Sequence, residues 1–209
     1  MCIRDSYDFI WDDFCDWYIE LAKIRMNGAD EESADSARRV LVWTMSNTLK
    51  LLHPFMPYIT EEIWQTLPHD GEALIVAKWP EYDEALSFPQ EAKNLENVMA
   101  LIRAIRTRRN EMNVPPSKKA HIYIDTAHPA PYEEASEFIA RLAYGSKVEI
   151  GTGFDVQGAV TAVTDDAKAL LPMDDLVDKA AETARLNKEL ANAQKQLDTV
   201  KAKLANEKF

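Results

Sequence analysis

Apolar side chains recur every three or four residues along most of this chain, as they do along one face of an amphipathic α-helix. The pattern predicts long helices over residues 6–26, 33–53 and 90–113, and a short helix that begins near Pro57. In the first helix the apolar stripe is Tyr7, Trp11, Phe14, Tyr18 and Leu21. Ser33 suits the N-terminal cap of the second helix. Asn27-Gly28 and Pro54 are typical of the two helix ends.

The period of the pattern changes after residue 113, where hydrophobic and polar residues begin to alternate. The stretch AHIYID at residues 120–125 alternates as a strand does, and KVEI, GAVTAVT and ALLP are further short strand candidates. Between them, YEEASEFIARLAYG has helical spacing. Residues from about 118 to 173 are therefore predicted to form a small α+β unit.

From Asp174 to the end, the chain is predicted to be one helix. Its apolar positions alternate steps of four and three, the pattern of a coiled-coil seam: Leu186, Leu190, Ala193, Leu197, Val200 and Leu204. One helix cannot bury such a stripe by itself, so we expect residues 186–209 to fray or to pack against another copy of the chain. The expected fold is mainly α, with a helical bundle, a small α+β junction and a long C-terminal coiled-coil helix.

The composition is that of a soluble globular protein, with 46% hydrophobic and 28% charged residues among 209. No apolar run approaches the roughly 20 residues that cross a bilayer, and the first residues lack the apolar core of a secretory signal. Two cysteines, Cys2 and Cys15, cannot build a disulfide framework or a four-cysteine zinc site. The sequence therefore predicts a cytoplasmic protein with no metal site and no membrane partner.

Charge is distributed unevenly along the chain, whose formal net charge is −11. Residues 103–119, RAIRTRRNEMNVPPSKK, contain six basic residues and one acidic residue, and we call them the basic segment. Residues 179–209 have a smaller excess, with seven basic and four acidic residues, and the rest of the chain is acidic. A ligand rich in phosphates would be attracted only to these two stretches.

The helical part of the basic segment contains two kinds of arginine. Arg103, Arg106 and Asn110 are spaced by three and four residues, which places them together on a flank beside the apolar face. Arg109 projects toward the apolar face itself, where an unpaired charge is costly to bury, and we expect a carboxylate partner for it. Val114 precedes a proline, so the stretch NVPPSKK (residues 113–119) should leave the helix as a stiff extended segment, which we call the strap.

No group of residues has the spacing of a catalytic or metal-binding motif. GTGFDVQG lacks the lysine of a phosphate-binding P-loop and does not open a helix. We interpret the four histidines as surface, capping or packing residues, because none is paired with a cysteine or an acid at ligand spacing: His53, His69, His121 and His128. The residues alone therefore indicate a binding module without an active site.

Three stretches together resemble one enzyme family. They are YDFIWDDFCDWYIELAK (residues 7–23), LLHPFMPYITEEIWQTL (51–67) and LIRAIRTRRNEMNVPPSKK (101–119). They closely resemble the C-terminal part of bacterial valyl-tRNA synthetases, and residues 186–209 resemble the first strand of that family's coiled-coil arm. Isoleucyl- and leucyl-tRNA synthetases share versions of the middle stretch, whereas NEMNVPPSKK followed by a coiled coil is similar to the valyl enzymes.

The resemblance implies a division of labour along the chain. Residues 7–115 would form a helical anticodon-binding domain of the class I synthetase type, residues 116–173 a junction, and residues 174–209 the first helix of an arm against the elbow of tRNA. Residues 1–6 depart from the family pattern and are interpreted as a non-family segment. The catalytic and editing domains, with ATP and Mg²⁺, would precede this chain in a longer, monomeric enzyme, so this part alone is expected to be inactive and without cofactors.

The resemblance also gives the basic segment a partner, the anticodon region of tRNA(Val). Arginine can hold phosphates with two hydrogen bonds and can stack on unpaired bases, and an anticodon loop offers both targets. The candidate tRNA-binding residues are Arg103, Arg106, Asn110, Asn113, Lys118 and Lys119, with Trp17, Glu20 and Arg108 as weaker candidates. Alternatively, the arginines pair with Asp12, Asp16 or Glu20 of the first helix, and the basic segment is structural.

Two other functions stay open for the sequence. The helical bundle could be a protein-interaction scaffold whose C-terminal helix forms a dimerising zipper, or the chain could be the equivalent part of an isoleucyl- or leucyl-tRNA synthetase. The isoleucyl enzyme usually ends in a cysteine-rich zinc segment, which two cysteines cannot form. The coding sequence upstream of Tyr7 would discriminate between these classes, since a synthetase would have its catalytic domain there.

Overall fold

A computed structural model describes residues 3–176, 190, 192–197 and 200–201. It contains two compact units, Met1–Ser87 and Phe88–Phe209, which we call the first and second units. The described part is mainly helical with one small mixed sheet, as the sequence predicts. Most of the predicted coiled-coil helix lies outside the described residues, so that helix and its self-association stay predictions. None of the described helices is long and apolar enough to cross a membrane.

In the first unit, the chain begins with a continuous helical stretch that changes its winding. α1 (Ile3–Asp8) leads into a π-helix, η1 (Phe9–Tyr18), which continues as α2 (Ile19–Met26). The sequence predicts a long helix over residues 6–26, and this range is helical, but the α-helical spacing of its apolar stripe is wrong for the ten residues of η1. A π-helix closes its hydrogen bonds at i→i+5 and seldom exceeds one turn, so apolar spacings of three and four do not reveal it.

The wider winding of η1 changes which aromatic side chains reach the interior. Phe14 and Trp17 are buried, whereas Trp11, which the predicted stripe assigns to the same face as Phe14, is 56% exposed. Tyr7 of α1 is also exposed and stacks on Trp11, with ring centroids 6.3 Å apart. Leu21 of α2 is buried, as predicted.

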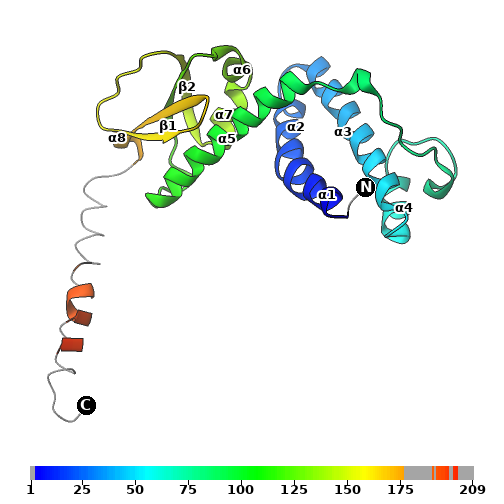
Figure 1. Cartoon of the computed structure of the whole chain (residues 1–209), viewed down its shortest axis with the longest axis horizontal. Helices are drawn as coiled ribbons and strands as arrows, with labels where there is room; N and C mark the ends of the chain where they lie inside the picture. Colours follow the sequence, from blue (N-terminus) through cyan, green and yellow to red (C-terminus); the bar gives the residue numbers. More distant parts are fainter. Residues whose placement is uncertain (1–2, 177–189, 191, 198–199, 202–209) are drawn as a thin grey trace, which may run out of the picture. The chain divides into compact units, whose positions relative to one another are not determined.

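Two further helices complete the first unit. α3 (Glu31–Leu52) runs antiparallel to α2, and α4 (Pro57–Gln65) packs against α3 (Figure 1). A buried cluster of Leu49, Trp64 and Leu74 joins α3, α4 and the loop that follows. The proline at the start of α4 occupies the first turn, where its missing N–H and fixed φ are tolerated.

The cap of α3 differs from the prediction. Asp30 is the capping residue, and its carboxylate accepts hydrogen bonds from the backbone N–H groups of Glu32 and Ser33. Ser33, the predicted cap, is inside the helix and its hydroxyl accepts a hydrogen bond from Arg25 Nε at 2.9 Å. A carboxylate at this position satisfies two free N–H groups and meets the positive end of the helix dipole, which explains the earlier start.

The loop after α4 is hydrogen-bonded to that helix. It contains two short 3-10 helices, η2 (Leu74–Val76) and η3 (Glu84–Leu86). Glu61 Oε1 accepts a hydrogen bond from Gln65 Nε2 (2.7 Å), and Glu61 Oε2 accepts one from the backbone N–H of Leu74 (2.8 Å). The Gln65 amide, and to a smaller extent the Leu74 N–H, lower the pKa of Glu61 because they favour its ionised form.

The second unit consists of a long helix, a four-stranded sheet and shorter helices. α5 (Pro89–Glu111) precedes the sheet, whose strands are β1 (Ala120–Thr126), β2 (Gly145–Gly151), β3 (Ala159–Val163) and β4 (Ala167–Pro172). The strand order is β2-β1-β4-β3. β1 and β2 are parallel, and the other two pairs are antiparallel. All four strands were predicted from the sequence.

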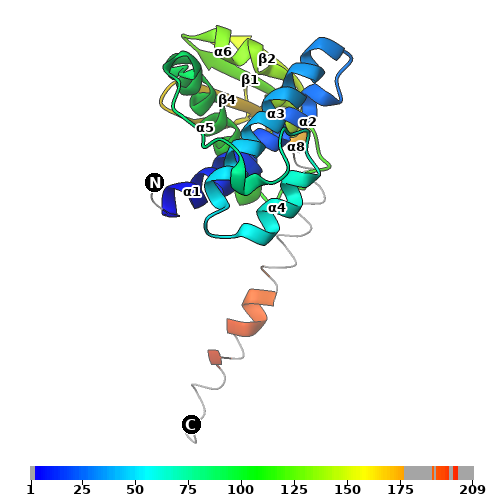
Figure 2. The same cartoon turned by 90° about the vertical axis from the view of Figure 1, so that its right-hand side faces the viewer.

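Helices pack against this sheet (Figure 2). α6 (Pro129–Glu134) and α7 (Ser136–Leu142) connect β1 to β2, and α8 (Met173–Leu176) follows β4. α5 contacts β3, β4, α6 and α7. Fully buried side chains of α5 and β1 contribute to this interior: Leu101, Ile102, Ile105, Ile122 and Ile124. The last turns of α5, which contain the basic arginines, are thereby held against the sheet.

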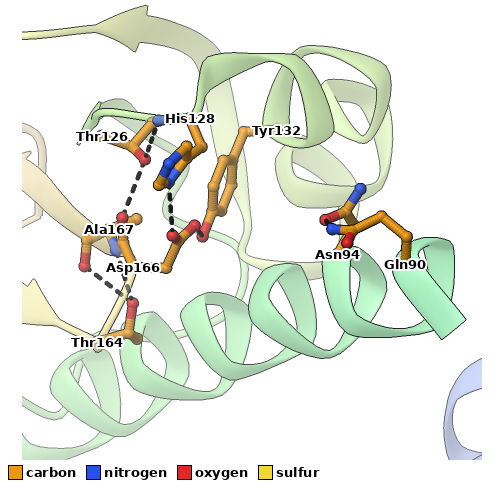
Figure 3. A network of polar contacts seen from close by, with 8 residues as sticks. All are labelled: Gln90, Asn94, Thr126, His128, Tyr132, Thr164, Asp166 and Ala167. Carbon is orange, nitrogen blue, oxygen red and sulfur yellow. Dashed lines mark hydrogen bonds and ion pairs between the residues drawn. The ribbon is translucent and has the colours of Figure 1, made fainter.

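A polar network fastens the turn between β3 and β4 to the start of α6 (Figure 3). Asp166 in this turn accepts a hydrogen bond from the hydroxyl of Tyr132 (2.9 Å) and contacts His128 Nδ1 (3.0 Å). Thr126 Oγ1, at the end of β1, donates to the Asp166 carbonyl (2.9 Å). Burial, together with the hydrogen bond to Asp166, raises the pKa of Tyr132. The network joins residues up to 40 positions apart, which sequence spacing does not reveal.

Candidate nucleic-acid interface

The basic segment begins on α5, where Arg109 occupies the buried face. Its side chain is 2% exposed, as its spacing predicts. Among the described residues it has no carboxylate partner, so that prediction is wrong. Instead, Arg109 Nη2 donates to the backbone carbonyls of Pro115 (3.2 Å) and Lys118, and the guanidinium carbon lies 5.5 Å from the centre of the Tyr144 ring. Burial lowers the pKa of this guanidinium.

Two other arginines of α5 also donate to backbone carbonyls. Arg106 Nε donates to the carbonyl of Leu142 (2.7 Å), the last residue of α7. Arg108 Nε donates to the carbonyl of Thr161 in β3 (3.1 Å), and its Nη1 pairs with Glu111 (2.9 Å). None of these partners is an acid of the first helix. These contacts therefore differ from the alternative interpretation, in which the arginines pair with Asp12, Asp16 or Glu20.

These hydrogen bonds fix the arginines without cancelling their charge. A backbone carbonyl is neutral overall, so a guanidinium that donates to it stays a source of positive potential, whereas a carboxylate partner offsets most of that potential at a distance. Glu111 offsets Arg108 in this way, but Arg109 keeps its charge. The basic segment therefore remains a positive region in an acidic chain.

The strap leaves α5 through a helix-ending motif centred on Asn113. This residue has a φ of 53°, in the left-handed region that asparagine tolerates better than most residues. The N–H of Asn113 donates to the Asn110 carbonyl (2.9 Å), and that of Val114 donates to the Arg109 carbonyl (2.9 Å). This pair of hydrogen bonds defines a Schellman motif, and Val114 is buried beneath it. Asn113, a candidate tRNA contact, thus has a structural role in its backbone.

The other candidates in the basic segment lie at the surface. Arg103 and Asn110 of α5 are exposed, as are Lys118 and Lys119 of the strap. Arg106 is half-buried, because its guanidinium reaches the end of α7. The second unit thus contains all six main candidates, and the contact of each residue with tRNA stays a prediction.

The two weaker candidates on the first helix belong to the first unit. Trp17 is 6% exposed, so its ring could stack on a base only after a rearrangement of the interior. Glu20 forms an ion pair with Lys23 of the same helix (2.6 Å). The surroundings of these two side chains give them structural contacts, and their role in binding tRNA also stays a prediction.

Two histidines of the second unit have acidic partners that are distant in sequence. His121 Nε2 lies 3.2 Å from a carboxylate oxygen of Glu149, and His128 Nδ1 lies 3.0 Å from one of Asp166. Both pairs join separate elements, so we interpret them as structural. In the part of the chain that the structure describes, no group of three His, Cys, Asp or Glu side chains is placed to hold a metal ion.

A second cluster of cations lies on α3 and was not predicted from the sequence. It lines a groove of about 520 Å³ that we call the Trp43 groove, whose side chains include Arg38, Arg39, Trp43, Asn47 and Lys50. The steps of four, four and three residues from Arg39 to Lys50 could have revealed it, because basic and aromatic residues at helical spacing share a face just as apolar ones do.

Two family models match this chain. The anticodon-binding domain of tRNA ligase matches residues 2–124, more than half of the chain, and the tRNA binding arm of valyl tRNA synthetase matches residues 178–209. The first match includes most of residues 1–6 and extends past residue 115 into β1. The domain boundaries expected from the sequence stay predictions.

Curated relatives of the chain are valine--tRNA ligases. Its identity is 42% to the enzyme of Staphylococcus saprophyticus, 40% to that of Bacillus subtilis and 43% to that of Geobacillus kaustophilus, each over 210 residues. Each alignment covers 99% of this chain and 24% of the relative, so the chain spans about a quarter of the length of the curated relatives it matches. The chain belongs to the anticodon-binding domain family of tRNA ligases and is similar to the C-terminal region of valine--tRNA ligases.

Proposed function

We propose that this chain binds tRNA(Val) as the C-terminal part of a valine--tRNA ligase, so that the complete enzyme can join valine to that tRNA. The observation that carries the proposal is the match of residues 2–124 to anticodon-binding domains, with the basic segment inside that match. Catalysis, with its ATP and Mg²⁺, is assigned to the rest of the longer enzyme. The chain alone should therefore give no valine-dependent ATP–pyrophosphate exchange.

The phosphates of the anticodon stem-loop are the proposed ligands of the basic segment. Arg103 is exposed on α5, and Lys118 and Lys119 are exposed on the strap. Arg109 donates to the carbonyl of Lys118 and so holds the strap against the end of α5. The strap that contains both lysines is therefore held against the helix that contains Arg103 before RNA arrives, which reduces the conformational entropy lost on binding.

The match of residues 178–209 to a tRNA binding arm supports a second contact with the same tRNA. Residues 179–209 contain seven basic and four acidic side chains, so this stretch shares the positive charge of the basic segment. We assign it to the elbow of the tRNA, in keeping with the resemblance of its sequence to the coiled-coil arm of the valyl enzymes.

A salt titration tests the role of the basic segment. The 209-residue chain is titrated with a valine-anticodon stem-loop RNA at several salt concentrations. Three to five phosphate contacts should give a log–log slope of about −2 to −3.5, at about −0.7 per contact with single-stranded RNA. Arg103→Ala should flatten the slope by about one contact. Lys93→Ala is the matched control, because Lys93 is exposed on the same helix but outside the basic segment.

The proposal predicts a difference between these two variants. Equal slopes for the unmodified chain and Arg103→Ala would contradict it, as would a slope that flattens equally in Lys93→Ala. The same titration with isoleucine- and leucine-anticodon stem-loops measures specificity. Tighter binding of either of those RNAs would favour the corresponding synthetase over the valyl enzyme.

A further inference from the structure

The Trp43 groove concentrates positive charge in a unit that is otherwise acidic. Residues 1–87 contain seven lysines and arginines and 17 aspartates and glutamates. Three of the seven cations line the groove, Arg38, Arg39 and Lys50, and no acid lines it. The lining of the groove is therefore cationic, although the carboxylates of Glu31 and Asp35, which lie outside the lining, pair with the two arginines.

The groove also displays an aromatic ring of the kind that binds unpaired bases. Trp43 is 57% exposed, although a tryptophan buried in a core would stabilise the fold. Arg39 lies four residues before it and Lys50 seven residues after it on α3. At 1.5 Å of rise per residue, these cations stand roughly 6 Å and 10 Å from Trp43 along the helix axis, one on each side of the ring.

The contacts around the Trp43 ring hold these side chains in place but leave them exposed to a ligand. Asn47 Nδ2 donates to the Trp43 carbonyl (3.1 Å). Arg38 pairs with Glu31 (3.0 Å) and Arg39 pairs with Asp35, and the arginine side chains are 47% and 80% exposed. Exposed ion pairs of this kind contribute about 0–1 kcal/mol, so a phosphate can replace the carboxylate at little cost.

We propose that the Trp43 groove binds single-stranded RNA, with one unpaired base stacked on the Trp43 indole and the flanking phosphates held by Arg39 and Lys50. An acidic peptide would match the cations but not the exposed ring, whereas a base attached to phosphates matches both. The inference rests on the proposed function in that it adds a second RNA contact, in the first unit, to the one assigned to the basic segment.

Fluorine NMR of the whole chain tests this site directly. The five tryptophans are replaced with 5-fluorotryptophan, and the Trp43 resonance is identified by its loss in Trp43→Phe. The probe is a seven-nucleotide single-stranded RNA. The Trp43 resonance should shift on addition of RNA, while that of Trp79, which is 53% exposed but does not line the groove, should stay in place.

Binding affinities give the second readout. Trp43→Ala should weaken binding of the seven-nucleotide RNA by roughly 5-fold to 150-fold, the range expected for loss of one stacked base. Trp79→Ala should leave the affinity unchanged, and Trp43→Phe should retain part of it because a smaller aromatic ring remains. Trp43 is largely exposed, so both replacements at this position should leave the fold intact, which melting curves would check.

Three results would overturn the inference. They are an unmoved Trp43 resonance, an equal shift with tripolyphosphate, which has no bases, and an equal shift with heptaglutamate, which would indicate an acidic peptide instead. Failure of the proposed function can be distinguished from failure of this inference, because the proposed function is tested by the stem-loop salt titration of Arg103→Ala. Unchanged stem-loop slopes in that variant would reject the basic segment without affecting the Trp43 resonance.

Discussion

The two basic clusters of this chain use their hydrogen-bond donors in different ways. On α3, Arg38 and Arg39 pair with acids of the same helix, Glu31 and Asp35. On α5, the arginines reach other elements, and Arg106 donates to the last carbonyl of α7. The first arrangement is local and exposed to solvent, and the second joins parts of the fold.

This difference separates positive surfaces that the fold depends on from those that it does not. An exposed pair on one helix contributes little to stability and offsets the charge of its arginine. A guanidinium bound to a carbonyl of another element keeps its charge and helps to hold that element in place. We therefore expect substitutions of the basic-segment arginines that bind carbonyls of other elements to change stability and RNA binding together, and substitutions in the Trp43 groove to change binding alone.

The largest effect is expected at Arg109. Arg109→Ala removes the donor to the Pro115 and Lys118 carbonyls and leaves a cavity beside Tyr144, so unfolding should require about 2–4 kcal/mol less free energy. Denaturant unfolding of the whole chain measures this. Arg109→Met should lower the free energy of unfolding by less, because methionine fills most of the space. It also removes the buried Nε and Nη1 donors, which have no hydrogen-bond partner within the described residues. A loss below 1 kcal/mol for Arg109→Ala would show that the strap is held by other contacts.

Arg106 and Arg103 provide a sharper comparison on the same flank of α5. Arg106→Ala should lower the free energy of unfolding by about 1.5–2 kcal/mol, the value of a charged hydrogen bond, because the Leu142 carbonyl loses its donor. Arg103→Ala, at an exposed position, should lower it by less than Arg106→Ala does. Paired melting curves and salt titrations distinguish the two variants. Equal stabilities would mean that the carbonyl contact contributes nothing.

A smaller effect is expected at the helix end. Asn113→Ala places a residue with a Cβ but no polar side chain at a φ of 53°, which should destabilise the chain by about 1 kcal/mol. Asn113→Gly should be neutral or slightly stabilising, since glycine adopts this conformation without strain. Weaker RNA binding in Asn113→Gly, with unchanged stability, would instead indicate that the asparagine side chain contacts RNA.

The smallest effect concerns acid sensitivity in the first unit. The pKa of Glu61 is lowered from its ordinary value of 4.5, so the ionised carboxylate stabilises the folded state above pH 4.5. That stability should be lost as the pH falls through the lowered pKa, when the carboxylate takes up a proton. Glu61→Gln should reduce this part of the acid dependence of the melting temperature. Identical acid titrations of the two proteins would show that the Leu74 contact does not contribute.

Much of the secondary structure and part of the candidate site follow from the sequence. The helical spacing identified α3, α5 and the buried position of Arg109, and alternation identified all four strands. The spacing of Arg103, Arg106 and Asn110 also placed them on one flank. These features are local, because a helix or strand has a fixed period and the period alone decides which residues share a face.

The partners of the charged side chains were decided by the tertiary structure. Arg106 binds a carbonyl 36 residues away and Arg108 one 53 residues away, and the expected carboxylate for Arg109 is replaced by carbonyls of the strap. A long side chain can reach any group that packing brings near, and neutral carbonyls leave no trace in a pattern of charges. The sequence by itself therefore determined where the positive charge is, and only the packing of α5 against the sheet and the strap decided which arginines also support the fold.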